Sequence, residues 1–235
     1  MLVLLDIDGT LVRCGGSGRQ ALNHAFSEVC GVDDALEGVR LAGSTDRIII
    51  EDACRAVGIT LDDDQVTAVF DAYVTHLRAL LEGEFPGYAV LPGARQVAEA
   101  LDRSAAHVVG LATGNIESAA RVKLAPAGLN EHLPFGGFGS DGRARTELLA
   151  RGIERGQALA EGALGAQVSA DQIWVVGDTE RDVRAARALG VRSVGVLHGS
   201  GHRDALTSEE PDLLVDSLLS PSLWAALGLP MSDRG

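Results

Sequence analysis

The sequence predicts an α/β protein, in which a parallel sheet with helices on both faces carries an inserted all-helical segment. Three observations lead to this prediction. The chain begins with a short apolar run, Leu2–Leu5, of the kind that a strand buried on both faces shows. Residues 14–89 then have only helical patterns. After about residue 90, predicted helices and apolar strands alternate, which favours parallel strands joined by helical crossovers.

The predicted insert holds three amphipathic segments. The first starts at an expected N-cap, Ser17, and stops at Gly31, while the second runs from an expected N-cap at Thr45 to Gly58. The third begins in the acidic run Asp62–Asp64, which we interpret as a solvated helix N-terminus and not as a metal site. The Pro and Gly residues of "EFPGYAVLPG" mark the end of the insert.

Helix and strand alternate in the rest of the chain. The predicted helices cover residues 94–101, 116–124, 146–160 and 181–189. The predicted strands lie in "HVVGLAT", "FGGFGS", "QIWVVGD", "RSVGVL" and "DLLVD". The predicted domains are therefore an α/β core formed by residues 1–13 and 90–235, and a helical unit formed by residues 14–89, inserted after the first strand.

The composition argues against several classes of protein. Twenty Lys and Arg residues against 33 Asp and Glu residues give a formal net charge of −13, so we expect neither nucleic acid nor membrane as a partner. No apolar run approaches the roughly 20 residues that cross a bilayer, and no basic leader precedes the first strand. Cys14, Cys30 and Cys54 form no C-x-x-C pair, which favours reduced thiols. We expect a cytoplasmic protein, as a monomer or a homodimer.

Polar residues follow three of the predicted strands. In open parallel sheets, binding sites form beyond the carboxyl ends of the strands. The residues at these ends are Asp6 and Asp8 after the first strand, Thr113, Gly114 and Asn115 after "HVVGLA", and Asp178 and Asp182 after "IWVV". We therefore expect the carboxylates, the hydroxyl and a helix N-terminus to converge at one edge of the sheet.

Such a convergence needs compensation, because a buried unpaired charge costs several kcal/mol. A Mg²⁺ ion bound by oxygens would supply it, and the helix N-terminus after Thr113 is suited to a phosphate. Asp6 and Asp8 lie two residues apart, so in an extended segment they point to the same side. Taken singly, turn chemistry explains "DID" and an N-cap explains "GDTERD" about as well as function does. The three motifs in order, each after an apolar run, favour function.

With "DIDGT", "TGN" and "GDTERD" in this order, the sequence resembles the haloacid dehalogenase superfamily, on its phosphatase side. The resemblance spans essentially the whole chain, and its nearest general likeness is to phosphoglycolate phosphatase-like enzymes. It implies a Rossmann-like core, a mobile helical cap formed by the insert, and Mg²⁺-dependent hydrolysis of a small phosphate monoester, either phosphoglycolate-like or a sugar phosphate.

The resemblance also implies roles for the residues at the strand ends. Asp6 would be the nucleophile that forms an aspartyl-phosphate, and Asp8 would protonate the leaving alcohol and later activate water. Thr113 would hold the phosphoryl oxygens, with Gly114 and Asn115 shaping the loop.

The implied metal site uses the same strand ends. Mg²⁺ would be held by the side chain of Asp6, the backbone carbonyl of Asp8 and the side chain of Asp178. Asp182 would orient these ligands from behind.

The sequence departs from the family pattern at the cation that serves the phosphate. Many members carry a Lys-Pro pair where this chain reads "GSDGRARTELL". The chain has a single lysine, Lys123, on the helix that follows Thr113. Helical side chains lean toward the N-terminus, and the alanines that precede Lys123 by three and four residues leave that path open. We favour Lys123 as the catalytic cation; Arg143 and Arg145 are the alternatives.

Other polar residues stay outside the expected site. His198 and His202 follow another strand, but lone histidines in Gly-rich loops are more often surface groups. Arg13, Arg19 and Arg47 could reach a substrate from the hinge or the insert, and only their position supports them.

Other functions stay open on this fold. A phosphosugar mutase of the same superfamily would use the same aspartates and turn over a sugar phosphate without releasing phosphate. A non-catalytic binding module normally lacks a nucleophile or a metal ligand, and none is missing here. A dehalogenase is disfavoured because it needs no acid at Asp8.

Overall fold

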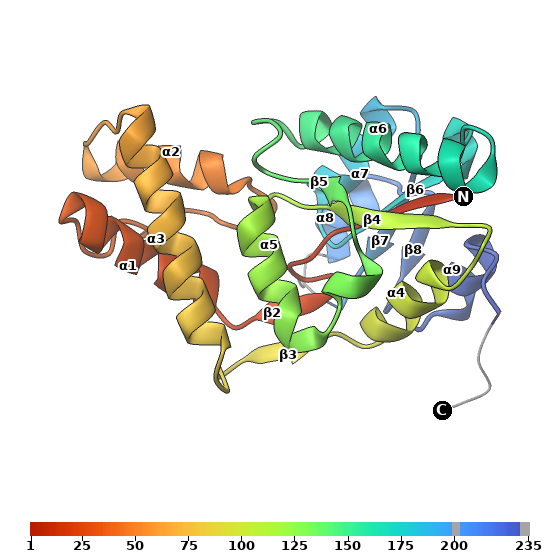
Figure 1. The fold of residues 1–235 in the computed structure, drawn as a ribbon, viewed down its shortest axis with the longest axis horizontal. Helices are drawn as coiled ribbons and strands as arrows, with labels where there is room; N and C mark the ends of the chain where they lie inside the picture. The colour runs from red at the N-terminus through yellow and green to blue at the C-terminus, as the bar shows by residue number, and fades with distance from the viewer. Residues whose placement is uncertain (199–202, 231–235) are drawn as a thin grey trace.

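The computed structural model describes residues 1–198 and 203–230 (Figure 1). Its centre is a six-stranded sheet in which every neighbouring pair is parallel. In spatial order the strands are β5 (Gly136–Gly137), β4 (Val108–Ala112), β1 (Leu2–Leu5), β6 (Ile173–Gly177), β7 (Arg192–Val196) and β8 (Leu213–Val215). The parallel α/β core predicted from the sequence is confirmed.

The register of the three central strands aligns their carboxyl ends. Leu5 of β1 lies opposite Leu111 of β4 on one side and Val176 of β6 on the other. The residues that follow each strand therefore emerge at the same edge of the sheet.

Helices cover both faces of this sheet. One face carries α6 (Arg145–Leu164) and α7 (Glu180–Ala188), and the other carries α4 (Ala94–Asp102), α5 (Glu117–Leu124) and α9 (Pro221–Ala226). The strand β1 shows why two faces are needed. Its side chains alternate, Leu2 and Leu4 packing under α6 while Val3 and Leu5 pack on the opposite face. A short helix, α8 (Arg203–Ser208), precedes β8.

The insert forms a separate helical unit, called the cap below, at the left of Figure 1. It contains α1 (Ser17–Cys30), α2 (Asp46–Val57) and α3 (Asp63–Leu81), whose apolar side chains pack into one core. Two short strands connect it to the sheet domain. These are β2 (Val12–Cys14) and β3 (Tyr88–Val90), which pair antiparallel with Cys14 opposite Tyr88.

The helix α5 lies between the two units. Its Ile116, Ala119 and Val122 side belongs to the apolar core of the cap, whereas Ala120 and Leu124 pack into the core of the sheet domain. Lys123, on the same helix, is consequently buried although it carries a charge. The cap–core boundary thus runs along the helix that follows Thr113.

The ends of the cap helices test three of the capping predictions. Thr45 caps α2 by accepting a hydrogen bond from the Ile48 N–H at 3.4 Å, and Asp62 caps α3. The prediction for Ser17 is wrong, because Ser17 is the first residue inside α1 and is buried. The N-cap is Gly16, whose φ of 91° is a conformation that a residue with a Cβ rarely adopts.

Other differences concern lengths and short elements. The helix expected at 146–160 extends over Arg145–Leu164, and the β2–β3 pair was not predicted. Strands of three residues leave too short a pattern to be distinguished from a loop. Among the described residues, no helix combines the length and apolar composition that a membrane span requires.

Candidate active site

The first motif lies at the centre of the sheet edge. Asp6 continues the β-ladder by donating its N–H to the Val176 carbonyl at 2.9 Å, and the residue is only 6% exposed. The chain then turns sharply at Gly9, which has a φ of 86°. A Cβ on Gly9 would lie 2.2 Å from a carboxylate oxygen of Asp178. The turn therefore needs a glycine both for its conformation and for the close approach of Asp178.

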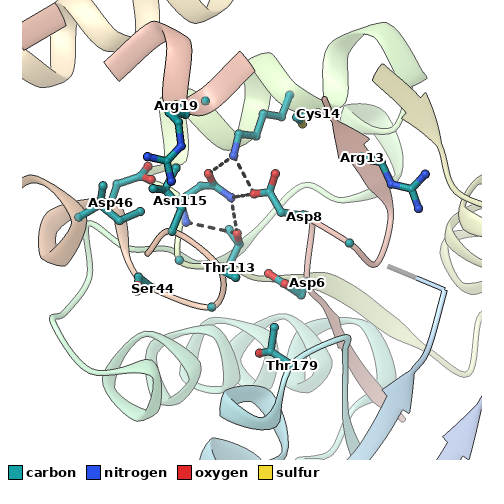
Figure 2. A pocket seen from close by; sticks show the side chains of 18 of the residues that line it. Asp6, Asp8, Arg13, Cys14, Arg19, Ser44, Asp46, Thr113, Asn115 and Thr179 are labelled. Carbon is teal, nitrogen blue, oxygen red and sulfur yellow. Dashed lines mark hydrogen bonds and ion pairs between the residues drawn. The ribbon is translucent and has the colours of Figure 1, made fainter. Parts of the chain in front are cut away.

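The loop after β4 connects to Asp8 through Asn115 (Figure 2). The Asn115 amide nitrogen donates to Thr113 Oγ1 and to Asp8 Oδ2, at 2.7 Å in each case. The Asn115 side-chain oxygen accepts from Lys123 Nζ at 2.6 Å. Since the nitrogen has two acceptors and the oxygen has a cationic donor, only this orientation of the amide satisfies all three contacts.

Lys123 completes this network. Its Nζ lies 2.7 Å from Asp8 Oδ2, and the side chain is 7% exposed. Gly18 of the cap lies beside it, where a Cβ would be in ordinary van der Waals contact with Nζ at 3.8 Å. The predicted path of Lys123 along α5 thus ends at the first motif, on Asp8.

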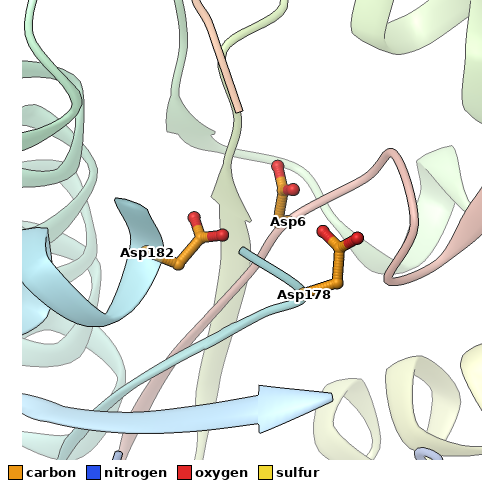
Figure 3. A group of neighbouring side chains, drawn as sticks. All are labelled: Asp6, Asp178 and Asp182. Atoms are coloured by element: carbon orange, nitrogen blue, oxygen red, sulfur yellow. The ribbon is translucent and has the colours of Figure 1, made fainter. Parts of the chain in front are cut away.

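The third motif brings two more carboxylates to the edge (Figure 3). One oxygen each from Asp6, Asp178 and Asp182 lies within 4.8 Å of the other two. Asp182 Oδ2 accepts from Thr179 Oγ1 at 2.7 Å and from the Thr179 N–H at 3.2 Å. Asp182 is therefore engaged with the start of its own helix, whereas Asp6 and Asp178 face each other across the strand ends.

Arg145 is the second cation at the site. Its Nη2 lies 2.9 Å from Asp6 Oδ1 and also donates to the Ala112 carbonyl at 3.2 Å. Its Nε donates to Asp182 Oδ1 at 2.9 Å. Its side chain is 10% exposed. Arg143, by contrast, is exposed and pairs with Glu51 of the cap. The two buried cations thus divide the first motif: Lys123 contacts Asp8, and Arg145 contacts Asp6.

Burial and charge set the protonation of these aspartates. Burial raises the pKa of Asp6 to about 6, although Arg145 acts against the shift. Burial also raises the pKa of Asp178, to about 9, with further increments from the carboxylates of Asp6, Asp182 and Asp8. Burial would raise the pKa of Asp8 as well, but the Lys123 ammonium and the hydrogen bonds from Asn115 and Lys123 lower it below its usual range.

This donor set fits a hard divalent cation. Asp178 is 3% exposed and is crowded by other carboxylates, so a positive charge beside it would relieve the repulsion that raises its pKa. Carboxylate and backbone oxygens are the ligands that Mg²⁺ prefers. Asp6, the Asp8 carbonyl and Asp178 could hold such an ion.

A cavity of about 390 Å³ opens over these residues. Its floor comes from the sheet edge, including Asp6, Asp8, Thr113 and Asp178, and its walls come from the cap. Cap residues on the walls include Arg19, Leu22, Leu41, Asp46, Ile49 and Tyr73. The space therefore lies between the two units, with polar groups on the floor and many apolar side chains on the cap side.

The arginines and histidines left outside the expected site lie as follows. Arg13 and Arg19 line the cavity, and Arg19 is held by the Val39 carbonyl at 2.7 Å. Arg47 does not line it and lies 3.6 Å from Glu51 in an ion pair. His198 Nε2 is 3.3 Å from the Thr10 carbonyl oxygen. His202 lies outside the described residues.

Asp46 lines the cavity but was not predicted from the sequence as a site residue. It is the first residue of α2, it is 4% exposed, and it contacts the loop after β4. An acidic residue in the first turn of a helix is the ordinary pattern of a favourable dipole interaction. Nothing in the local sequence distinguishes Asp46 from a solvated residue of that kind.

The fold and the site define a doubly wound α/β protein with a helical cap and a carboxylate-rich edge at the central strands. The chain belongs to the haloacid dehalogenase-like hydrolases, the family that matches residues 1–190.

Several proteins named phosphoglycolate phosphatase are similar in sequence. The one from Salmonella choleraesuis (strain SC-B67) is 43% identical over 64 residues, which are 27% of this chain and 25% of that protein. The chain thus matches only about a quarter of the length of that relative. Those from Agrobacterium fabrum and Rhodospirillum rubrum are 28% and 29% identical, cover 96% and 99% of this chain, and are each covered over 93% of their length.

Solved structures show the same fold. CbbY from Rhodobacter sphaeroides, in complex with phosphate, superimposes with a TM-score of 0.72 at 19% identity, over 97% of this chain and 99% of that one. A predicted phosphoglycolate phosphatase from Haemophilus somnus gives a TM-score of 0.64 at 19% identity, over 92% and 94% of the two chains.

Proposed function

We propose that this protein is a Mg²⁺-dependent phosphatase that hydrolyses a small phosphate monoester through an aspartyl-phosphate on Asp6. One observation carries the proposal. Asp6, Asp8, Thr113 and Asp178 lie at the carboxyl ends of three adjacent parallel strands and, together with Lys123 of α5, line one cavity. The full-length similarity to proteins named phosphoglycolate phosphatase supports the same reaction class.

In the first step, an Asp6 carboxylate oxygen attacks the phosphorus atom, and the bond from phosphorus to the ester oxygen breaks. Asp8 gives its proton to that oxygen, so the product leaves as a neutral alcohol. In the second step, a water oxygen attacks the phosphorus of the aspartyl-phosphate. Asp8 takes the proton from this water, the acyl-phosphate bond breaks, inorganic phosphate is released, and the Asp6 carboxylate is regenerated.

The contacts of Asp8 suit the second step directly. Lys123, at 2.7 Å, keeps its carboxylate ionised and ready to accept a proton. The first step requires the protonated form. A bound phosphate dianion would compete for the Lys123 ammonium, and its negative charge would raise the pKa of Asp8. We therefore assign Lys123 to the phosphate as well as to Asp8.

The remaining residues would bind the phosphate and Mg²⁺ and orient the catalytic side chains. In this proposal Thr113 Oγ1 and the backbone of Gly114 would bind phosphoryl oxygens, while Asn115, through its hydrogen bonds to Thr113, Asp8 and Lys123, would keep these side chains in position. Asp6, the Asp8 carbonyl and Asp178 would hold Mg²⁺, with Asp182 and Arg145 supporting the carboxylates from behind. When bound, Mg²⁺ would neutralise charge between the nucleophile and the phosphate.

The test is a phosphate-release screen over small metabolite esters in the presence of Mg²⁺, with Asp6→Asn as the matched control. We expect release by the native protein and a loss of several orders of magnitude in the variant, which lacks the nucleophile. Near-normal turnover by Asp6→Asn would exclude the covalent route. Turnover of a sugar phosphate without phosphate release would indicate a phosphosugar mutase, and no turnover of any ester would favour a binding module.

A further inference from the structure

Asp46 connects the cap to the loop that follows β4. Its N–H donates to the Gly114 carbonyl at 2.8 Å, and its Oδ2 accepts from the Ile116 N–H at 2.9 Å. A single cap residue thus makes one hydrogen bond in each direction, to the two residues on either side of Asn115. Figure 2 shows Asp46 and Asn115 next to each other on the same side of the cavity.

The backbone around this contact is closely packed. A Cβ on Gly114 would lie 2.2 Å from the Ser44 carbonyl oxygen, so the cap loop rests directly on Gly114. On the opposite side, Gly139 donates its N–H to the Asn115 carbonyl at 2.8 Å, and a Cβ there would lie 2.1 Å from the Gly114 oxygen. The loop is therefore held between the cap and the sheet domain.

Asp46 also lies at a helix end. Ile116 is the N-cap of α5, and its apolar side chain cannot accept the hydrogen bonds of the first-turn N–H groups. Asp46 accepts the N–H of Ile116 itself, which places a carboxylate of the cap at the positive end of the α5 dipole. Because Asp46 is also the first residue of α2, its carboxylate lies at the N-termini of two helices, one on each side of the boundary.

This contact differs from the other contacts of the same cap segment. Arg143 and Glu51 pair across the boundary, but the arginine side chain is 65% exposed. Thr45 Oγ1 reaches the Arg143 carbonyl only at 3.5 Å. Exposed pairs of that kind contribute little energy, whereas a buried carboxylate that accepts a backbone N–H depends strongly on its partner.

We propose that Asp46 is a positioning residue, through which docking of the cap completes the phosphate-binding loop. While the cap is docked, Asp46 fixes Gly114 and Ile116, and Asn115 between them holds Asp8 and Lys123. When the cap moves away, both hydrogen bonds break, and the loop around Asn115 is held only from the side of the sheet domain. The inference rests on the proposed function for its catalytic consequence, but the structural coupling stands apart from it.

The experiment compares Asp46→Ala and Asp46→Asn with the native protein. In Mg²⁺ with para-nitrophenyl phosphate, we expect Asp46→Ala to lower kcat by roughly 10- to 100-fold, since small misplacements of catalytic groups have effects of that size. Asp46→Asn keeps an oxygen that can accept from Ile116 and should recover most of the rate. The control is Asp52→Ala, an exposed acid on the same helix that pairs with Arg55; it should leave kcat unchanged.

Hydrogen exchange of the Ile116 amide gives a readout that does not require turnover. Exchange should be slow in the native protein, faster in Asp46→Ala and slow again in Asp46→Asn. If Asp46→Ala does not fold, the comparison of Asp46→Asn with the native protein still decides, because faster Ile116 exchange together with a large loss of kcat in Asp46→Asn would overturn the inference. Equal exchange in all three proteins, native kcat in folded Asp46→Ala, or equal losses in the two variants would overturn the inference. If the native protein hydrolyses no ester, the proposed function fails while the exchange result still decides the role of Asp46.

Discussion

Lys123 Nζ lies 2.7 Å from Asp8 Oδ2, and both groups contact the side-chain amide of Asn115. The only lysine in the chain therefore contacts Asp8, the residue proposed as acid and base. Asp6, the proposed nucleophile, has a separate cation, Arg145, 2.9 Å away. Two aspartates two residues apart thus experience different fields, which is the condition under which they can take different roles.

The first prediction separates Lys123 from Arg143. Lys123→Ala should lower kcat roughly 100-fold, because phosphoryl transfer depends on positioned positive charge. Arg143→Ala should change it by less than about twofold, since the pair that Arg143 makes with Glu51 is exposed. Steady-state kinetics of both variants decide the matter. Loss in Arg143→Ala together with normal rates in Lys123→Ala would move the catalytic cation to the later loop.

Substitution is the better route here than chemical labelling. Lys123 is 6% exposed, and although burial acts to lower its pKa, the neighbouring Asp8 and other acidic groups raise it well above its ordinary value. Amine reagents attack the neutral form, so this side chain should react slowly.

The second prediction concerns Arg145. Arg145→Met would leave two buried carboxylates, Asp6 and Asp182, without their partner, so the free energy of unfolding should fall by roughly 3–5 kcal/mol. Arg145→Lys keeps the positive charge but loses the planar guanidinium group. Its free energy of unfolding should therefore lie between those of Arg145→Met and the native protein. Denaturant titration measures all three. Unchanged stability in Arg145→Met would mean that the two contacts contribute nothing.

The third prediction concerns Asp178. Its pKa is raised to about 9 in the folded protein, against about 4 when unfolded. Between these values the folded state binds more protons, so the native protein without metal should lose stability as pH rises through this window. Asp178→Asn removes this dependence and should be more stable in chelator at pH 8, by an amount on the order of a few kcal/mol.

The matched measurement is the melting temperature against pH, with and without Mg²⁺. Mg²⁺ should raise the melting temperature of the native protein and leave that of Asp178→Asn unchanged. A difference between the two metal-free proteins that stays constant from pH 5 to pH 8 would contradict the assignment of the shift to Asp178.

The fourth prediction concerns the size of the substrate. The cavity of about 390 Å³ is walled by the cap, so only small monoesters fit while Asp46 is docked on Gly114. Para-nitrophenyl phosphate and short metabolite esters should be hydrolysed, and a folded phosphoprotein should be cleaved several orders of magnitude less efficiently. Comparable kcat/KM values for the two would show that the cap does not restrict access.

The positions of the strand-end residues could be predicted because they follow from topology. An apolar run predicts a buried strand, and parallel strands of similar register end at one edge, so Asp6, Thr113 and Asp178 had to meet. The path of Lys123 followed in the same way, from the helix phase after Thr113 and the direction in which helical side chains lean.

The contacts of Arg145 and Asp46 could not be derived in this way. Arg143 and Arg145 are the same residue type and lie two residues apart, so the sequence does not distinguish them. In the structure, the first turn of α6 packs against β4 and directs Arg145 into the site, whereas Arg143 stays exposed. The contacts of Asp46 depend on how the cap packs against the loop after β4. That arrangement is a tertiary property, for which a helix pattern in one unit holds no signal.

The pairing of β2 with β3 has a consequence for how such chains can diversify. Because Cys14 lies opposite Tyr88, the insertion leaves and re-enters the sheet domain at neighbouring points. The more than seventy residues between Cys14 and Tyr88 are therefore inserted like the loop of a β-hairpin. The length or fold of this insert can change without altering the register of any strand in the sheet. Changes in the cap that leave its contacts with α5 and the Asp46 hydrogen bonds in place can therefore arise without altering the residues at the strand ends.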